Sequence, residues 1–336
     1  MPQGMPAVRR APPWGDDAQR RGGNLKPRLL QHGRLMASLE AALAEHFDLH
    51  PLWREADPRA FLATRGGEFV ALVTSARTGA DRALIEALPR LRAIACFGVG
   101  VDAVDLAAAR ERSVAVSNTP DVLTDCVADL AFGLLIDVAR RLSAADRFVR
   151  RGDWLKGQFP LATRVSGKRL GIVGLGRIGA AIARRAAGFD MPVRYHGRRR
   201  IDGCGYGYEP SLAALAAWAD FLVIACAGGP GTRRLVSREV LDALGADGFL
   251  VNIARGSVVD ETALVEALLA GRIAGAALDV FEDEPQVPPA LLALDQVVLL
   301  PHIASATRET RQAMADCVLA NLRQWFAQGR LLTPVQ

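Results

Sequence analysis

Three polar residues of this chain could together transfer a proton and hold a carboxylate. His302 lies in the segment VVLLPHIAS, Glu284 in AALDVFEDEP and Arg255 in LVNIARGSVVD. An imidazole can give or take a proton near neutral pH. A carboxylate beside it can orient the ring and favour its protonated form, and a guanidinium can grip an anionic substrate through paired hydrogen bonds.

Each of these residues follows an apolar run that predicts a buried strand. In an open α/β sheet, ligands bind outside the carboxyl ends of the strands. Taken singly, each residue has an ordinary structural explanation, as a cap, a polar turn or a loop histidine. Taken together, they form a chemically complete set.

A glycine-rich turn provides a second signature, in the stretch RLGIVGLGRIG at 169–179. Gly174 allows a tight turn, Gly176 lets the backbone approach phosphates, and Gly179 lets the following helix pack on the strand. A dinucleotide pyrophosphate would then lie at the helix N-terminus. We expect cofactor contacts from Gly174, Leu175, Gly176, Arg177, Ile178 and Gly179.

The strand predicted at 193–196 is followed by Gly197 and by three arginines, Arg198, Arg199 and Arg200. No carboxylate stands at the end of this strand. An acidic residue there would hold the ribose hydroxyls and repel a 2′-phosphate, whereas guanidiniums bind a phosphate. We therefore predict a preference for NADP(H), with Arg198 first and Arg199 next, and leave NAD(H) open. A solvated basic loop is the alternative interpretation.

The composition is that of an ordinary globular protein. The 336 residues are enough for two domains, half are hydrophobic, and the formal net charge is +5. This modest charge suits small anionic ligands and does not indicate a nucleic-acid partner. The five scattered cysteines lack CxxC spacing, so we expect no disulfides, no metal site and a cytoplasmic location.

Residues 1–26 are rich in arginine, proline and glycine and have no continuous apolar stretch. We expect a disordered basic tail here rather than a secretory signal, with a basic arm for an anionic partner as the alternative. The most apolar segment, 212–226, is broken by Asp220 and predicts a helix and a buried strand rather than a membrane span.

Alternating short strands and helices predict parallel α/β sheets. We expect strands at 28–31, 71–74, 93–95, 114–116, 170–173, 193–196, 221–225, 248–253, 275–278 and 297–300. We expect helices at 35–47, 83–88, 106–112, 122–141, 142–151, 237–244, 262–270 and 309–327.

With these motifs in place, the chain resembles the D-isomer-specific 2-hydroxyacid dehydrogenase family over about residues 28–330. The resemblance rests on FGVGVD, GLGRIG, NIARG, ALDVFEDEP and PHIAS. It is closest to NADP-preferring glyoxylate/hydroxypyruvate reductases and to 2-ketogluconate or hydroxyphenylpyruvate reductases. The glycine-rich segment 227–232 departs from the family pattern.

The resemblance implies an α/β fold of two Rossmann-like or flavodoxin-like doubly wound parallel-sheet domains with a cleft between them. Residues 27–120 and 307–336 would form the substrate (catalytic) domain, and 121–306 the NAD(P)-binding domain. It also implies a homodimer joined through the cofactor domain, with the long helix after Pro120 in the interface.

The same resemblance assigns roles to single residues. Arg255, Glu284 and His302 would be catalytic, and the backbone N–H groups of Val99 and Gly100 would join Arg255 in holding the substrate carboxylate. Asp279 would hold the nicotinamide region, and Ile253 and His302 would also contact the cofactor. Side chains near the substrate's variable group are expected among Leu52, Trp53, Arg77 and Phe159.

The expected activity is NADPH-dependent reduction of a small 2-oxo acid to a D-2-hydroxy acid. One alternative is a non-enzymatic, NAD(P)-sensing scaffold of the corepressor kind. Others keep the fold but act on 2-ketogluconate or hydroxyphenylpyruvate, or oxidise formate or phosphite. The family's formate enzymes carry glutamine where Glu284 stands, which disfavours formate.

Overall fold

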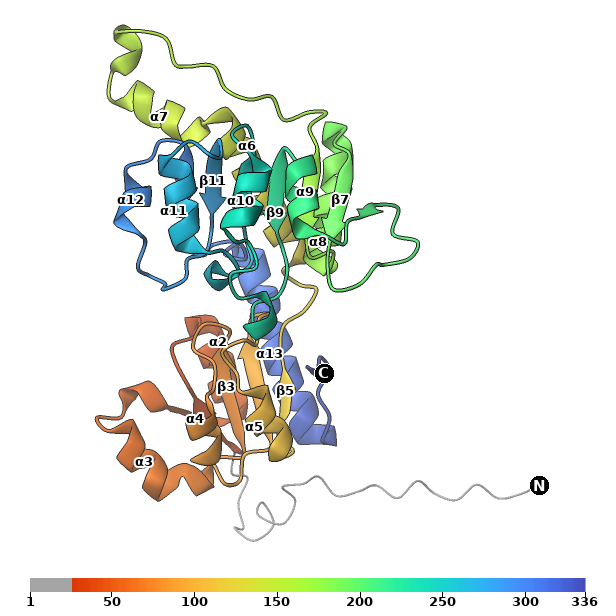
Figure 1. Ribbon diagram of the computed structural model, residues 1–336. Coiled ribbons are helices and arrows are strands. Elements are labelled where there is room, and N and C mark those ends of the chain that lie inside the picture. Colours follow the sequence, from red (N-terminus) through yellow and green to blue (C-terminus); the bar gives the residue numbers. More distant parts are fainter. Residues whose placement is uncertain (1–25, 336) are drawn as a thin grey trace, which may run out of the picture. The chain divides into compact units, whose positions relative to one another are not determined.

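The computed structural model describes residues 26–335 (Figure 1), so all of the expected basic tail except Lys26 lies outside the described residues. Within this range the chain forms two compact units, residues 26–122 with 308–335, and residues 123–307. The chain passes from the first unit to the second between residues 122 and 123 and returns between residues 307 and 308.

The first unit is built on a parallel sheet, which we call the smaller sheet. In the described chain it has five strands in the order β2-β1-β3-β4-β5, which is the flavodoxin-like doubly wound order. Their bounds are β1 Arg28–Gln31, β2 Asp48–Pro51, β3 Ala71–Ser75, β4 Ala93–Phe97 and β5 Ala115–Ser117.

The helices of the first unit are α2 Ala37–His46, α3 Pro58–Arg65, α4 Arg82–Glu86, α5 Leu106–Glu111 and α13 Arg308–Gln328. Among them (Figure 1), α2, α5 and α13 contact strands of this sheet, whereas α4 contacts α5 and α3 contacts the turn that follows it. Asp57, Asp81 and Asp105 each accept a hydrogen bond from an N–H of the first turn of a helix, which explains where α3, α4 and α5 begin. α13 packs against α2 and β4, so the end of the chain completes this unit.

The second unit is built on the larger sheet, whose described strands number seven in the order β12-β11-β10-β9-β6-β7-β8. The β8-β7-β6-β9-β10-β11 part is the Rossmann order, to which β12 is added. Their bounds are β6 Leu170–Val173, β7 Val193–His196, β8 Gly207–Tyr208, β9 Phe221–Ile224, β10 Phe249–Asn252, β11 Gly275–Leu278 and β12 Val297–Leu299. Their paired neighbours are parallel.

The helices of the second unit are α6 Thr124–Arg140, α7 Leu142–Arg150, α8 Arg177–Ala186, α9 Leu212–Trp218, α10 Arg238–Leu244, α11 Glu261–Leu269 and α12 Pro289–Leu292. α6 packs against α8 and over β10 and β11. Single 3-10 turns lie at Leu52–Arg54, Gly66–Glu68, Asp153–Leu155, Ala187–Phe189, Pro230–Thr232 and Gly256–Val258.

The predicted strands are all present, whereas β2, α3, β8 and α12 were not predicted. β2 reads DLHP, lies at the sheet edge and is only partly buried, so it lacks a strand's apolar signal. α3 has no fully buried residue, and β8 has only two residues. Within residues 26–335, no helix combines the length and apolarity that crossing a membrane requires.

Candidate active site

Arg255, Glu284 and His302 leave the larger sheet at the carboxyl ends of three adjacent strands. β10 pairs with β11 and β11 with β12, with Asn252 opposite Leu278 and Leu278 opposite Leu299. The loops that carry the three residues therefore begin at one level on one edge. This is the edge where open α/β sheets bind ligands.

The structure brings Glu284 and His302 into direct contact. The Nδ1 atom of His302 lies 2.8 Å from Oε2 and 3.1 Å from Oε1 of Glu284. An ionised carboxylate only accepts hydrogen bonds, so Nδ1 carries a proton and Nε2 is left for other partners. The His302 side chain is 39% exposed and that of Glu284 19%, so the imidazole is more accessible than its half-buried partner.

The backbone after His302 is fixed by Asp279, at the end of β11. Its carboxylate is fully buried and accepts the N–H groups of Ile303 at 2.7 Å and Ala304 at 2.9 Å. Burial raises the pKa of Asp279, and these two hydrogen bonds oppose the rise. His302 itself has a φ of +55°, a left-handed conformation that side chains seldom adopt. Asp279 therefore shapes the turn that presents the imidazole.

Asn252 plays the matching part for Arg255. It is 1% exposed; its amide donates to the Arg255 carbonyl at 3.0 Å, and its side-chain oxygen accepts the Ala254 N–H at 3.0 Å. A Cβ on Gly256 would lie 1.8 Å from the carbonyl carbon of Phe281, so this turn is pressed against the segment leading to Glu284. This role of Asn252 was not predicted from the sequence. The signal that could have indicated it is a polar residue at the end of an apolar run.

The glycine turn has the geometry that a pyrophosphate site needs. Gly174 has a φ of +94°, and a Cβ there would lie 2.6 Å from the Cα of Cys226. A Cβ on Gly179 would lie 2.1 Å from the Gly174 carbonyl oxygen, so α8 packs directly on the turn. Around Gly176, by contrast, no described atom beyond its chain neighbours and its own helix backbone lies within 4 Å of a Cβ position, and no side chain in the described chain caps this end of α8. The backbone N–H groups at the start of α8 and the open space beside Gly176 therefore suit a bound pyrophosphate.

The other predicted cofactor residues lie on the same unit. Leu175 is buried in the turn, Arg177 and Ile178 open α8, and Ile253 is buried directly after β10. Phe159, expected near the substrate, lies in the segment after α7 and packs on Phe148 of that helix.

The arginine loop follows β7 and is anchored at both ends. The Tyr195 hydroxyl accepts the Ile201 N–H at 2.6 Å, and the Tyr208 hydroxyl donates to the Gly197 carbonyl at 3.2 Å. Arg198 and Arg199 are exposed and form no ion pair with the described residues, while Arg200 lies 3.9 Å from the exposed Asp202. The guanidiniums of Arg198 and Arg199, on a loop anchored by Tyr195 and Tyr208, can therefore bind an anion.

In the first unit, the Val99–Gly100 loop follows β4 and is tied to the end of the chain. The Asn118 amide donates to the Val99 carbonyl at 2.8 Å, and the Thr333 hydroxyl donates to the Asn118 carbonyl at 2.6 Å. Buried Asn321 in turn binds the N–H and the hydroxyl of Thr333. The C-terminal segment thus supports the loop that is expected to hold the substrate carboxylate.

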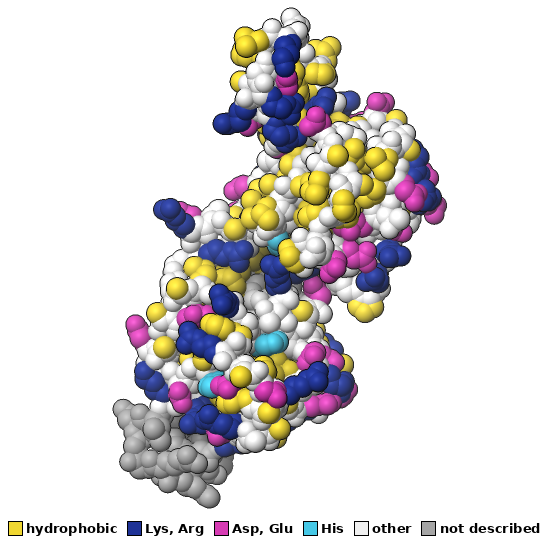
Figure 2. Space-filling model, turned by 90° about the vertical axis from the view of Figure 1, so that its left-hand side faces the viewer, with side chains coloured by type: hydrophobic (Ala, Val, Ile, Leu, Met, Phe, Trp, Pro, Cys, Tyr) yellow, Lys and Arg dark blue, Asp and Glu magenta, His cyan; other side chains and the backbone are white. Residues whose placement is uncertain are grey.

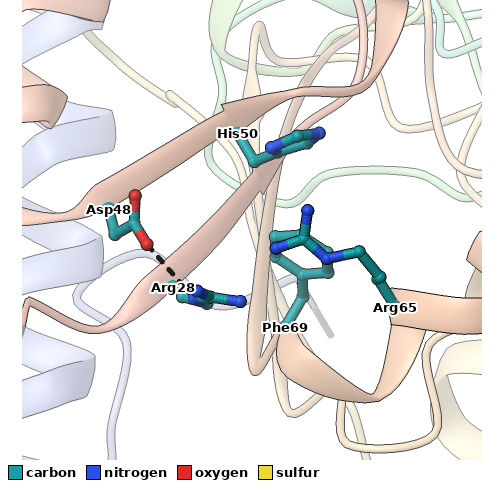
Figure 3. A pocket seen from close by; sticks show the side chains of 5 residues that line it. All are labelled: Arg28, Asp48, His50, Arg65 and Phe69. Carbon is teal, nitrogen blue, oxygen red and sulfur yellow. Dashed lines mark ion pairs between the residues drawn. The ribbon is translucent and has the colours of Figure 1, made fainter. Parts of the chain in front are cut away.

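A hollow of about 180 Å³ lies beside β1 and β2 in the first unit (Figure 3), and none of the candidate site residues described above lines it. Its charges compensate one another, because Arg28 pairs with Asp48 at 3.2 Å and both Arg28 and Arg65 pair with Glu68. We assign it no chemistry. Its lining residues are Arg28, Asp48, His50, Arg65 and Phe69. In the described chain, no group of His, Cys, Asp or Glu could hold a metal ion.

Comparison with known proteins identifies the family of this chain. The model of the D-isomer specific 2-hydroxyacid dehydrogenase, NAD binding domain, matches residues 132–304. The chain belongs to this family. It is therefore an NAD(P)-dependent oxidoreductase with the family's two parallel-sheet domains.

The chain is 50% identical to hydroxyphenylpyruvate reductase from Plectranthus scutellarioides over 297 residues, 88% of this chain and 95% of that protein. It is 49% identical to glyoxylate/hydroxypyruvate reductase A from Arabidopsis thaliana, with the same coverage. The crystal structure of NADPH-dependent glyoxylate/hydroxypyruvate reductase from Sinorhizobium meliloti, in complex with NADP and malonate, matches with a TM-score of 0.86 and 43% identity, over 92% of this chain and 97% of that one.

Proposed function

We propose that this dehydrogenase is an NADPH-preferring reductase of small 2-oxo acids, of the glyoxylate and hydroxypyruvate type, and that it forms D-2-hydroxy acids. The observation that carries the proposal is the direct contact of His302 with Glu284, beside the Arg255 turn on adjacent strands. A bound dinucleotide supplies a hydride to the carbonyl carbon. The protein must then stabilise and protonate the oxygen on which negative charge develops.

His302 is the group that gives this proton. Its Nδ1 is engaged by Glu284, so Nε2 faces the substrate oxygen and acts as general acid in reduction and as base in oxidation. The Glu284 carboxylate orients the ring and stabilises its positive charge. Asp279, by holding the two N–H groups after His302, keeps the ring from turning away.

Arg255 holds the substrate carboxylate and polarises the carbonyl. Its guanidinium offers paired, charge-assisted hydrogen bonds to an oxygen anion. The N–H groups of Val99 and Gly100 take the remaining carboxylate oxygens, a role for backbone that the Asn118 contact with Val99 supports. An α-oxo carboxylate is the smallest molecule that satisfies all of these groups.

The preference for NADPH rests on Arg198 and Arg199, which are exposed and form no ion pair in residues 26–335. The nearest carboxylate after β7 in sequence, Asp202, points into solvent. The matched Sinorhizobium meliloti reductase is NADPH-dependent, which supports the same assignment.

Steady-state kinetics with glyoxylate and hydroxypyruvate test the proposal. We expect higher kcat/KM with NADPH than with NADH and D-glycerate as the product from hydroxypyruvate. We expect the double variant Arg198→Gln with Arg199→Gln to lower kcat/KM with NADPH about tenfold or more and to leave kcat/KM with NADH unchanged. Arg164→Gln, an exposed arginine after α7, is the matched control. A wild-type preference for NADH would contradict the cofactor assignment.

The same assay separates the alternatives. A scaffold protein would bind NADPH but show negligible turnover, and the enzymatic names of the matched relatives do not favour it. Adding 4-hydroxyphenylpyruvate and 2-ketogluconate to the panel ranks the substrates. Higher kcat/KM with either than with glyoxylate and hydroxypyruvate would contradict the assignment to the small acids.

We also propose a cytoplasmic homodimer joined through the unit of residues 123–307. In and after α7, the exposed fraction is 54% for Val149, 69% for Trp154, 94% for Leu155 and 100% for Leu161. Hydrophobic side chains gather over this unit in Figure 2. A second copy would remove such surface from water, and the five free cysteines suit a reducing compartment.

Analytical ultracentrifugation tests the assembly. We expect a dimer for the wild type and monomers for Leu155→Glu with Leu161→Glu. A wild-type monomer at micromolar concentration would contradict the proposed dimer.

A further inference from the structure

Three arginines and a tryptophan lie at the carboxyl edge of the smaller sheet, outside the groups already assigned to the reaction. Arg34 follows β1, Trp53 and Arg54 follow β2, and Arg77 follows β3. This is the edge at which the Val99–Gly100 loop follows β4.

The loops on this edge touch one another. A Cβ on Gly33 would lie 2.5 Å from the Thr78 hydroxyl oxygen, so the Arg34 loop packs on the Arg77 loop. A Cβ on Gly98 would lie 2.5 Å from the Ala76 Cβ, so the Arg77 loop packs on the substrate loop. A continuous row of loops therefore runs from Trp53 to Val99.

Trp53 gathers two of the positive charges. The guanidinium carbon of Arg34 lies 4.8 Å from the Trp53 ring centroid, and that of Arg54 lies 4.9 Å from it. Both distances are those of cation–π contacts. The indole N–H is buried and has no acceptor among the described residues, a situation that calls for a partner such as a ligand oxygen.

The positive charge here is not neutralised by the protein. Within residues 26–335, Arg34, Arg54 and Arg77 form no ion pair, although other arginines of this unit do, Arg82 with three carboxylates. The neighbouring carboxylates are engaged elsewhere: Glu55 with His50, Glu40 with Gln31 and the Leu35 N–H, and Asp81 as the cap of α4. Like charges held together without a counter-charge are the arrangement that binds an anion.

We propose that Arg34, Trp53 and Arg54, with Arg77 beside them, receive the group at the far end of the 2-oxo acid and select substrates that carry a second anionic group there. This inference rests on the proposed function, because it takes the α-carboxylate to be held by the Val99–Gly100 loop and Arg255. The second anion is a carboxylate or a phosphate. Aromatic and purely aliphatic groups leave the guanidiniums without a counter-charge.

Two matched substrate pairs test the selection and separate the two anions. 2-Oxoglutarate is compared with 2-oxovalerate, which lacks the distal carboxylate, and hydroxypyruvate 3-phosphate with hydroxypyruvate. We expect kcat/KM to favour the charged member by about tenfold or more, mainly through KM. The advantage should shrink as salt is raised. Preference in only one pair assigns the site to that anion.

The variants Arg34→Gln with Arg54→Gln, and Arg77→Gln alone, link the preference to these side chains. We expect both to lower kcat/KM for the charged substrates and to leave glyoxylate, which has no distal group, within about twofold. The control is Arg59→Gln, an exposed arginine in the first turn of α3, and it should change neither value.

The inference is overturned if the neutral members of both pairs are reduced as well as the charged ones, or if the double variant keeps the full preference. In either case continued glyoxylate reduction leaves the proposed function standing. If the wild type reduces no 2-oxo acid at all, both the proposed function and this inference are wrong.

Discussion

At the carboxyl edge of the larger sheet, the side chains that we assign to the reaction are held by hydrogen bonds, whereas at the same edge of the smaller sheet Arg34 and Arg54 rest on an aromatic ring. His302 is fixed by Glu284, and the turn after it by Asp279. Arg34 and Arg54 have no carboxylate partner within residues 26–335.

The difference follows from the two tasks. A group that stabilises developing charge must be in place before the reaction, because reorienting it at that moment raises the barrier. A group that attracts an incoming anion must instead keep its charge uncompensated until the ligand arrives. The first edge is therefore expected to respond to mutation mainly through kcat, and the second mainly through KM.

Arg255→Gln should have the largest effect among the tests of this comparison. It removes the paired, charged hydrogen bonds to the substrate carboxylate, so we expect kcat/KM for glyoxylate to fall about a hundredfold to ten-thousandfold. NADPH affinity, measured by fluorescence titration, should stay within a few-fold. Retention of a tenth or more of wild-type kcat/KM would mean that Arg255 does not hold the substrate.

Asp279→Asn tests whether the hydrogen bonds from the Ile303 and Ala304 N–H groups to Asp279 position His302. Asparagine replaces one acceptor oxygen with an NH2 donor, so one of the two backbone N–H groups loses its hydrogen bond. Because this misplaces the imidazole, we expect kcat to fall about tenfold to a hundredfold. Asp283→Asn, an exposed carboxylate on the same loop as Glu284, is the control. A change confined to the KM for NADPH would instead assign Asp279 to the cofactor alone.

Glu284→Gln should change the pH profile of reduction more than its maximum. A neutral amide can still orient the imidazole but stabilises its protonated form less than a carboxylate does. The acid form is then lost sooner, so the decline in kcat/KM for reduction should begin at lower pH than in the wild type. A profile identical to that of the wild type would show that the 2.8 Å contact has no role in proton transfer.

Thr333→Val is expected to give the smallest effect. It removes the hydroxyl bound to the Asn118 carbonyl and so loosens the support of the Val99 loop. The KM for glyoxylate should rise about threefold to tenfold, while kcat and the KM for NADPH should remain unchanged. Equal losses in kcat and in NADPH binding would point to general unfolding instead.

Sequence alone could locate the strand ends and the glycine turn because apolar runs and close backbone approach leave local signals. The role of Asp279 toward the His302 turn could not be predicted, since its partners lie 24 and 25 residues further along the chain. Asn252 was missed although its partners are local, at Ala254 and Arg255. Trp53 and Arg77 were expected near the substrate. Their grouping with Arg34 was missed because it depends on β2, a polar edge strand without an apolar pattern.

The central claim is that His302 donates the proton in reduction, and the most direct test is single-turnover reduction of glyoxylate by NADPH-loaded His302→Asn. The account predicts that NADPH binds as in the wild type while its oxidation slows about a hundredfold to ten-thousandfold. Oxidation of NADPH at a near wild-type rate would contradict it.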